Sequence, residues 1–168
     1  MSPFLSRIIF CVFLLLSHYV LYASDATPTA QQKLIDARIS EAEIIYKSDF
    51  KRAYTIAVDA KTKAVNIEYT EGIVASSCLQ SIIESQTNKS NIAIEGLNKI
   101  LHSSKSINLK LRQQLLSTLG ACYFYIGKLD SAQYYYNESI SSFSSNDTTI
   151  QLFKSCLQLS EVFIKENI

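Results

Sequence analysis

The segment LGACYFYIGKLDSAQYYYNESI, residues 119–140, decides the fold of the chain. Half of the protein's ten tyrosines fall in this segment, with small residues between them. Gly127 can end a helix because glycine adopts the left-handed conformation without a Cβ penalty. Asp130 and Ser131 are residue types that begin helices, since their side chains accept hydrogen bonds from N–H groups of the first turn. The segment therefore predicts two helices joined by a tight turn at Gly127.

Related segments recur at a regular interval along the chain. The tetrapeptide Ser-Cys-Leu-Gln occurs at residues 77–80 and again at 155–158. The segment at 116–123 lies about halfway between the two, with Leu119 in the place of Leu79 and Leu157. A second series ends in alanine at nearly the same period, at Ala53, Ala93 and Ala132. Two series that agree in period indicate a structural repeat of about forty residues, in which each unit stacks on its neighbours.

Helical periodicity fills each repeat. With 4 glycines and 2 prolines among 168 residues, the chain has few turn residues, which disfavours a strand-rich fold. Apolar residues recur at helical spacing, and we predict an all-α fold with helices at residues 31–47, 50–66, 68–86, 89–104, 107–126, 130–143 and 147–166. Asp49 is expected to cap the second helix, and Asn146 or Asp147 the last.

Two of these helices have a clear apolar face. The helix at 50–66 is expected to bury Ala53, Ile56, Ala57 and Ala60. The helix at 107–126 has a leucine-rich face, made up of Leu109, Leu111, Leu115, Leu116, Leu119 and Tyr123. A chain of 168 residues with 48% hydrophobic content can bury the core of one domain.

The residues of the opening segment match the spacing Leu-Gly-x2-Tyr-x3-Gly-x4-Ala-x3-aromatic, at Leu119, Gly120, Tyr123, Gly127, Ala132 and Tyr136. This pattern resembles the tetratricopeptide repeat, most specifically over residues 113–146. The resemblance implies an α-solenoid of antiparallel helix pairs, with units at 31–66, 68–104 and 107–146 and a half-unit at 147–168. The usual unit has about 34 residues, so the longer period implies longer helices or longer connections.

The pattern residues are expected to pack the two helices of a pair. Gly120 and Ala132 would let the helix axes approach closely, because neither side chain is bulky. Tyr123 and Tyr136 would fill the space beside them and bury a large area while each hydroxyl stays near water. Tyr134 and Tyr135 are expected to face outward or to meet the next unit.

The resemblance also implies a concave groove lined by the first helix of each pair. Its positions would be Gln114, Ser117, Ala121, Phe124 and Tyr125, and in the preceding unit Val74, Ser77, Ser81, Glu84 and Ser85. Neither set contains the Lys, Arg and Asn with which some family members hold a C-terminal carboxylate, so such a clamp is not expected. Phe124 and Tyr125 either contact a partner or pack under the last helix, against Val162 or Phe163.

Residues 1–23 have the parts of a secretory signal peptide. Arg7 precedes the apolar run at 8–16, and the small residues Ala23 and Ala26 follow it. Cleavage is expected after Ala23, with Ala26 as the alternative. Residues 8–23 are short for a membrane span of about 20 residues, and an uncleaved anchor is the other interpretation. We therefore expect a periplasmic or secreted protein whose repeat domain covers 31–168.

Composition argues against several kinds of function. A formal net charge of +1 gives no field that attracts nucleic acid. Neither a metal-ligand cluster nor a Gly-rich phosphate loop is present, and no nucleophile, base and orienting group stand out together. The cysteines Cys78, Cys122 and Cys156 are expected to be small buried thiols. The sequence thus predicts no enzyme, no metal and no cofactor.

What remains is a surface for binding. The sequence predicts an exported scaffold for a protein or peptide, and the alternative is the sensory input module of a membrane-spanning signalling or transcription regulator of the same family. Self-association through the last helix is a second possible partnership, because that helix is apolar on more than one side. Contact with a membrane is expected only through an uncleaved anchor.

Overall fold

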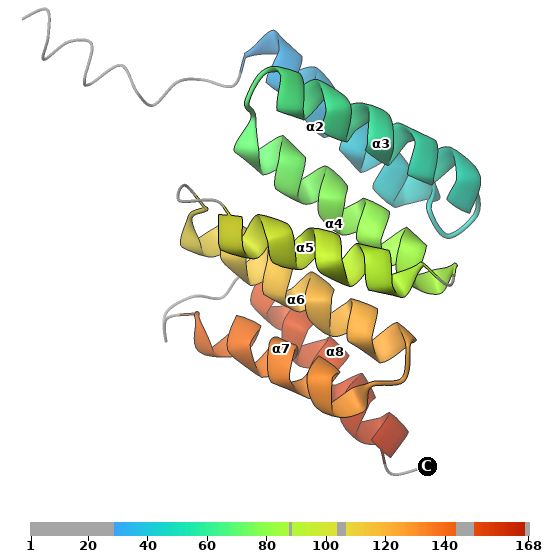
Figure 1. Ribbon diagram of the computed structural model, residues 1–168, viewed down its shortest axis with the longest axis vertical. Coiled ribbons are helices and arrows are strands. Elements are labelled where there is room, and N and C mark those ends of the chain that lie inside the picture. Colours follow the sequence, from blue (N-terminus) through green and yellow to red (C-terminus); the bar gives the residue numbers. More distant parts are fainter. Residues whose placement is uncertain (1–28, 88, 104–106, 144–149, 167–168) are drawn as a thin grey trace, which may run out of the picture. The chain divides into compact units, whose positions relative to one another are not determined.

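The fold is all-helical over the residues that the computed structural model describes, namely 29–87, 89–103, 107–143 and 150–166 (Figure 1). The helices are α2 (Ala30–Ile45), α3 (Phe50–Asn66), α4 (Thr70–Gln86), α5 (Ser90–Ser103), α6 (Leu109–Tyr125), α7 (Leu129–Ser141) and α8 (Ile150–Glu166). The all-α prediction is confirmed, and each predicted helix corresponds to one of these. The expected signal peptide and the caps at Asn146 or Asp147 lie outside the described residues.

Helix ends follow local chemistry, with one correction. The Asp49 carboxylate accepts a hydrogen bond from the Arg52 N–H at 2.9 Å, so its predicted role as a cap is confirmed. Gly127 ends α6 with a φ of 75°. The prediction that Asp130 and Ser131 begin α7 was wrong. The first helical bond already joins the Ala132 N–H to the Lys128 carbonyl at 3.0 Å, because the turn is completed directly after Gly127.

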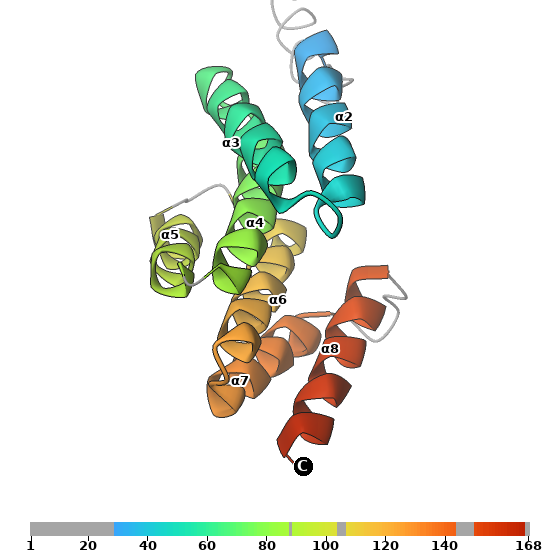
Figure 2. The ribbon, with the colours of Figure 1, turned by 90° about the vertical axis from the view of Figure 1, so that its right-hand side faces the viewer.

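From Leu34 onward the described helices belong to one compact unit. Neighbours in sequence pack together: α4 lies against α3, α5 and α6, and α6 lies against α4, α5, α7 and α8. Figure 2 shows α3 and α5 on one side of α4 and α6, with α2 and α8 on the other. No described helix is long and apolar enough to cross a membrane.

The apolar cores are shared between helices that lie next to one another. The predicted alanine-rich face of α3 is buried, with Ala53, Ala57 and Ala60 at 0% exposure, and it packs on α2 and α4. The central cluster joins α4, α5 and α6 through Val74, Leu97, Leu115, Leu119 and other residues. The prediction that Leu109 belongs to the apolar face of α6 was wrong. Leu109 is 55% exposed at the first position of the helix, where no described helix covers it.

Gly120 and Tyr136 form the closest packing between α6 and α7. A methyl group on Gly120 would lie 2.7 Å from Cδ1 of the Tyr136 ring, which is closer than carbon atoms approach. Tyr136 is 1% exposed and Ala132 is fully buried, and Tyr123 stacks on Tyr135 with ring centroids 5.2 Å apart. A side chain larger than hydrogen at Gly120 would force the two helices apart.

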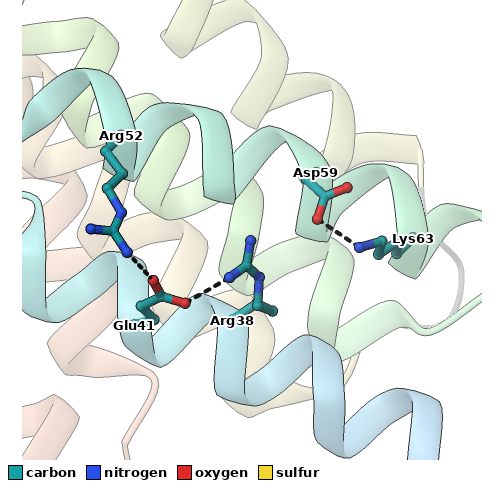
Figure 3. Close-up of polar contacts among 5 residues, drawn as sticks. All are labelled: Arg38, Glu41, Arg52, Asp59 and Lys63. Carbon is teal, nitrogen blue, oxygen red and sulfur yellow. Dashed lines mark hydrogen bonds and ion pairs between the residues drawn. The ribbon is translucent and has the colours of Figure 1, made fainter.

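Ion pairs lie on the outer surface of α2 and α3 (Figure 3). Glu41 accepts from Arg38 at 2.8 Å on its own helix and from Arg52 of α3 at 2.9 Å. Lys63 and Asp59 pair at 2.8 Å within α3. All five side chains are substantially exposed, so these pairs contribute little stability, and the fold depends on the apolar contacts beneath them.

Candidate functional site

A cavity of about 380 Å³ lies among α2, α4, α6 and α8, and we call it the inner cavity. Its lining comes from α2 (Glu43, Tyr46), α4 (Ala75, Cys78, Leu79, Ile82), α6 (Gln114, Ser117, Thr118, Ala121) and α8 (Lys154, Gln158). A volume of this size is within the range of small-ligand and peptide clefts. The inner cavity is therefore the candidate site.

The walls from α4 and α6 are built from equivalent positions. In each helix the lining residues follow the i, i+3, i+4, i+7 spacing of one helical face. Ala75 precedes Gln114 by the same offset, 39, as Ile82 precedes Ala121. The chemistry of the two walls differs, because α4 contributes apolar side chains while α6 contributes Gln114, Ser117 and Thr118. A ligand would meet an apolar wall and a hydrogen-bonding wall at once.

Several polar groups at the inner cavity are left unpaired by the part of the chain that is described. The Gln114 side-chain amide has no hydrogen-bond partner there, and neither does the hydroxyl of Tyr46. The Gln158 Oε1 accepts from Ser117 at 3.1 Å, which leaves its Nε2 group available. Glu43 and Lys154 bring one charge of each sign, from α2 and α8. The cavity thus offers donors, acceptors and both charges.

A buried hydroxyl cluster fixes α8 as one wall of the cavity. Ser155 of α8 is fully buried; its Oγ donates to Ser117 Oγ of α6 at 3.2 Å and lies 3.3 Å from Ser139 Oγ of α7. Ser139 in turn donates to the Gln113 carbonyl at 3.1 Å. Buried hydroxyls stabilise only when they are paired, so this cluster orients α8 and with it Lys154 and Gln158.

The predicted groove residues of α6 divide into two groups. Gln114, Ser117 and Ala121 line the inner cavity. Phe124 instead packs in the cluster that holds Val162 of α8, and the Lys165 Nζ lies 4.6 Å from its ring centroid. This is the second of the two expected arrangements, packing under the last helix.

Tyr125, the remaining position of that group, is 45% exposed. Burial of the rest of its side chain raises the pKa of the Tyr125 hydroxyl, and the neighbouring Tyr46 and Glu161 raise it further. Since Tyr46 also lines the inner cavity, Tyr125 stands near one end of the cavity without being part of its wall.

The prediction of groove positions on α4 was wrong. Val74, Ser77, Ser81, Glu84 and Ser85 are all buried, with exposures of 0–6%, and none of them lines the inner cavity. They correspond to the α6 positions at an offset of 40, whereas the structure aligns the helices at 39. One residue turns a helix by about 100°, so the wrong offset selected the face that packs on α3, α5 and α6.

Chemistry at the thiols is suppressed by burial. Desolvation raises the pKa of Cys78 to about 12 and that of Cys122 to about 11. Cys156 differs from the expectation, since it is exposed on α8. Among the described residues no group of His, Cys, Asp and Glu side chains is arranged to hold a metal ion.

Sequence reasoning identified Gln114, Ser117 and Ala121 but missed most of the cavity wall. Glu43, Tyr46 and Lys154 carry no motif that marks them. Gln158 ends the repeated tetrapeptide, but nothing in that motif marks it as a cavity residue. The four residues meet only because four helices converge. The α4 wall had a usable signal, since stepping back by one repeat from Gln114, Ser117 and Ala121 leads to Ala75, Cys78 and Ile82. Comparison with known proteins adds no assignment, because no family model, curated protein or solved structure matches the chain.

Proposed function

We propose that this protein is a non-enzymatic, exported scaffold that binds an extended peptide segment of a partner protein in the inner cavity. The observation that carries the proposal is the pairing of an apolar wall on α4 with unpaired amides of α6 and α8. An extended peptide offers backbone N–H and C=O groups along one edge and side chains beside them. Gln114 and Gln158 would bond the backbone, while a small apolar side chain would contact Leu79 and Ile82.

The proposed architecture is an α-solenoid of tetratricopeptide type. Its supports are the equivalence of the α4 and α6 walls, one repeat apart in the chain, and the approach of α7 to Gly120 of α6. In such folds each unit contacts only its neighbours, and the first helices together line one face. The inner cavity lies on that face.

The charged residues of the inner cavity are expected to favour particular side chains in the bound peptide. Glu43 favours a basic side chain near α2, and Lys154 favours an acidic one near α8. Both groups belong to exposed residues, so each contact would add selectivity more than affinity. A segment with an apolar residue between a basic and an acidic one fits the cavity best.

A displayed library of random twelve-residue peptides tests the proposal. Selected peptides are expected to bind with a Kd on the order of micromolar, typical of small peptide contacts. Gln114→Ala and Gln158→Ala should each weaken binding several-fold, and Ala75→Met should weaken it by filling the cavity. Gln133→Ala, on α7 and away from the cavity, is the matched control.

Peptide binding by the variants and by the control decides whether the inner cavity is a peptide site. If no peptide is enriched, or if all four variants bind selected peptides as the unmodified chain does, the inner cavity is not a peptide site. Weakening by Gln133→Ala to the same degree would equally contradict the proposal, because that side chain lies on another helix.

Export rests on the pattern in residues 1–23 and has a direct test. The chain is expressed with a C-terminal tag in a bacterial host, and the N-terminal residue of the recovered protein is determined by mass spectrometry. Cleavage after Ala23 predicts Ser24 as the first residue, and cleavage after Ala26 predicts Thr27. Recovery of the intact chain in the cytoplasm would contradict export.

A further inference from the structure

We propose that the outer face of α8 is a self-association surface, on which two copies of the chain pair α8 antiparallel to α8 about a two-fold axis near Leu157. Leu157, Glu161 and Ile164 do not line the inner cavity, whereas Lys154, one turn before Leu157, does. The proposal does not depend on the proposed function. It starts from the contacts of α8, which packs on α7 and α6 through Ser155, Val162 and Leu159.

The opposite side of α8 is apolar and uncovered. Leu157 is 52% exposed and Ile164 is 62% exposed. The two residues are seven apart, so they lie on the same side of the helix. Within the described part of the chain, α4 is covered by α5 and α6 by α7, whereas α8 has no such covering helix. Two large exposed side chains in line on one helix are the pattern of a helix-packing surface.

Charge identifies the occupant as a second copy. Lys154 precedes Leu157 by three residues and Glu161 follows it by four, and neither makes an ion pair with another described residue. In an antiparallel pair whose axis passes between Leu157 and Gln158, each Lys154 comes opposite the Glu161 of the other copy. A parallel pair would place like charges together, which is unfavourable. The face is thus complementary to itself in one orientation.

Helix length agrees with this register. The middle residue of α8 (Ile150–Glu166) is Gln158, so pairing about Leu157 overlaps nearly the whole helix, about 25 Å at 1.5 Å per residue. A single helix pair buries an area at the low end for specific interfaces. The expected complex is therefore a dimer that dissociates on the order of micromolar concentration.

A charge exchange tests the register directly. Sedimentation velocity of the full chain between about 1 and 100 µM should show a dimer whose share rises with concentration. Lys154→Glu and Glu161→Lys should each weaken association about tenfold, because each creates two like-charge contacts. The double variant restores opposite charges and should recover the dimer. Leu157→Asp should abolish it, and Ile92→Asp on α5, also exposed, should leave it unchanged.

Cross-linking gives an independent measurement at the axis. In a Cys11→Ser, Cys156→Ser background, Leu157→Cys should form an intermolecular disulfide under mild oxidation, since the two copies of this residue meet. Cys placed at Ile92 should not. The proposal is overturned if the chain stays monomeric at about 100 µM, or if the double exchange is as weak as the single ones. It is also overturned if Leu157→Asp still dimerises.

Discussion

Three glycines show how differently one residue type acts in this chain. Packing requires glycine at position 120, because the Tyr136 ring occupies the space that the methyl group of an alanine would need. Backbone conformation favours glycine at position 127, because its φ of 75° is unfavourable for residues with a Cβ. Gly96 of α5 has neither constraint, since nothing lies within 4 Å of an added methyl group there. Replacing each by alanine separates the two effects.

Urea unfolding of the three variants is expected to give three different results. Gly120→Ala should lower the free energy of unfolding by about 1–3 kcal/mol through overpacking. Gly127→Ala should lower it by about 1 kcal/mol through backbone strain. Gly96→Ala should raise it by about 0.5–1 kcal/mol, because alanine is the better helix former. Equal effects at Gly120 and Gly96 would contradict the close approach of α6 and α7.

The three thiols of the described residues should differ in reactivity. Raised pKa values near 12 for Cys78 and 11 for Cys122 keep both protonated at pH 8, and the thiolate is the reactive form. Cys156 is exposed. In a Cys11→Ser variant, a chromogenic disulfide reagent at pH 8 should therefore label one thiol rapidly and the other two only on unfolding. Rapid labelling of two or more would contradict the burial.

At the scale of the element, a buried polar cluster helps to hold α8 in place. Its inner side places the fully buried Ser155 beside Ser117 of α6 and Ser139 of α7. Hydroxyl contacts are directional, so they determine how α8 is rotated about its axis. That rotation turns Gln158 toward the inner cavity and Leu157 away from it.

Ser155→Ala should loosen this element. The substitution removes the hydroxyl that donates to Ser117 Oγ and is expected to cost about 1–2 kcal/mol of unfolding free energy, as for other buried hydrogen bonds. The control is Ser160→Ala on the exposed side of α8, where the hydroxyl donates only to the Leu157 carbonyl of its own helix; its effect should stay within about 0.5 kcal/mol. A Ser155 effect no larger than the Ser160 effect would show that the cluster does not hold α8.

At the scale of the whole molecule, contacts run almost entirely between neighbouring helices. Among the described helices, α4 and α6 are each packed against at least three others, whereas α8 packs against two. Stability in such arrays is nearly a sum of local terms, and the least covered units open first.

Hydrogen exchange should follow this difference in cover. At protein concentrations below the proposed dimerisation range, backbone amides in the middle of α4 and α6 should exchange at least about tenfold more slowly than those in the middle of α8. Mass spectrometry of peptides from the three helices measures this. At high concentration, protection of α8 should rise if it pairs with a second copy. Uniform protection of all three helices would indicate a single cooperative unit instead.

The helices themselves were predictable from local chemistry. Caps such as Asp49, a terminating glycine at Gly127 and apolar residues at helical spacing depend on a few neighbouring residues each. The expected α6 positions Gln114, Ser117 and Ala121 do line the inner cavity. They lie in residues 113–146, where the repeat pattern is clearest and fixes which side of the helix each residue occupies. The start of α7 was misplaced by its Asp-Ser pair, since the helix begins at Leu129 and Lys128, in the N-cap position, makes no side-chain hydrogen bond to it.

The sequence by itself determined that the chain is all-helical and that its pattern repeats at a regular interval. Both properties depend only on the spacing of residues along the chain, which can be read without knowing how the helices pack. Only the tertiary structure decided which face of α4 meets the inner cavity, and that Glu43, Tyr46, Lys154 and Gln158 complete its wall. The physical reason is the helical turn of about 100° per residue: an error of one residue in register, invisible in the pattern, exchanges a buried face for an open one.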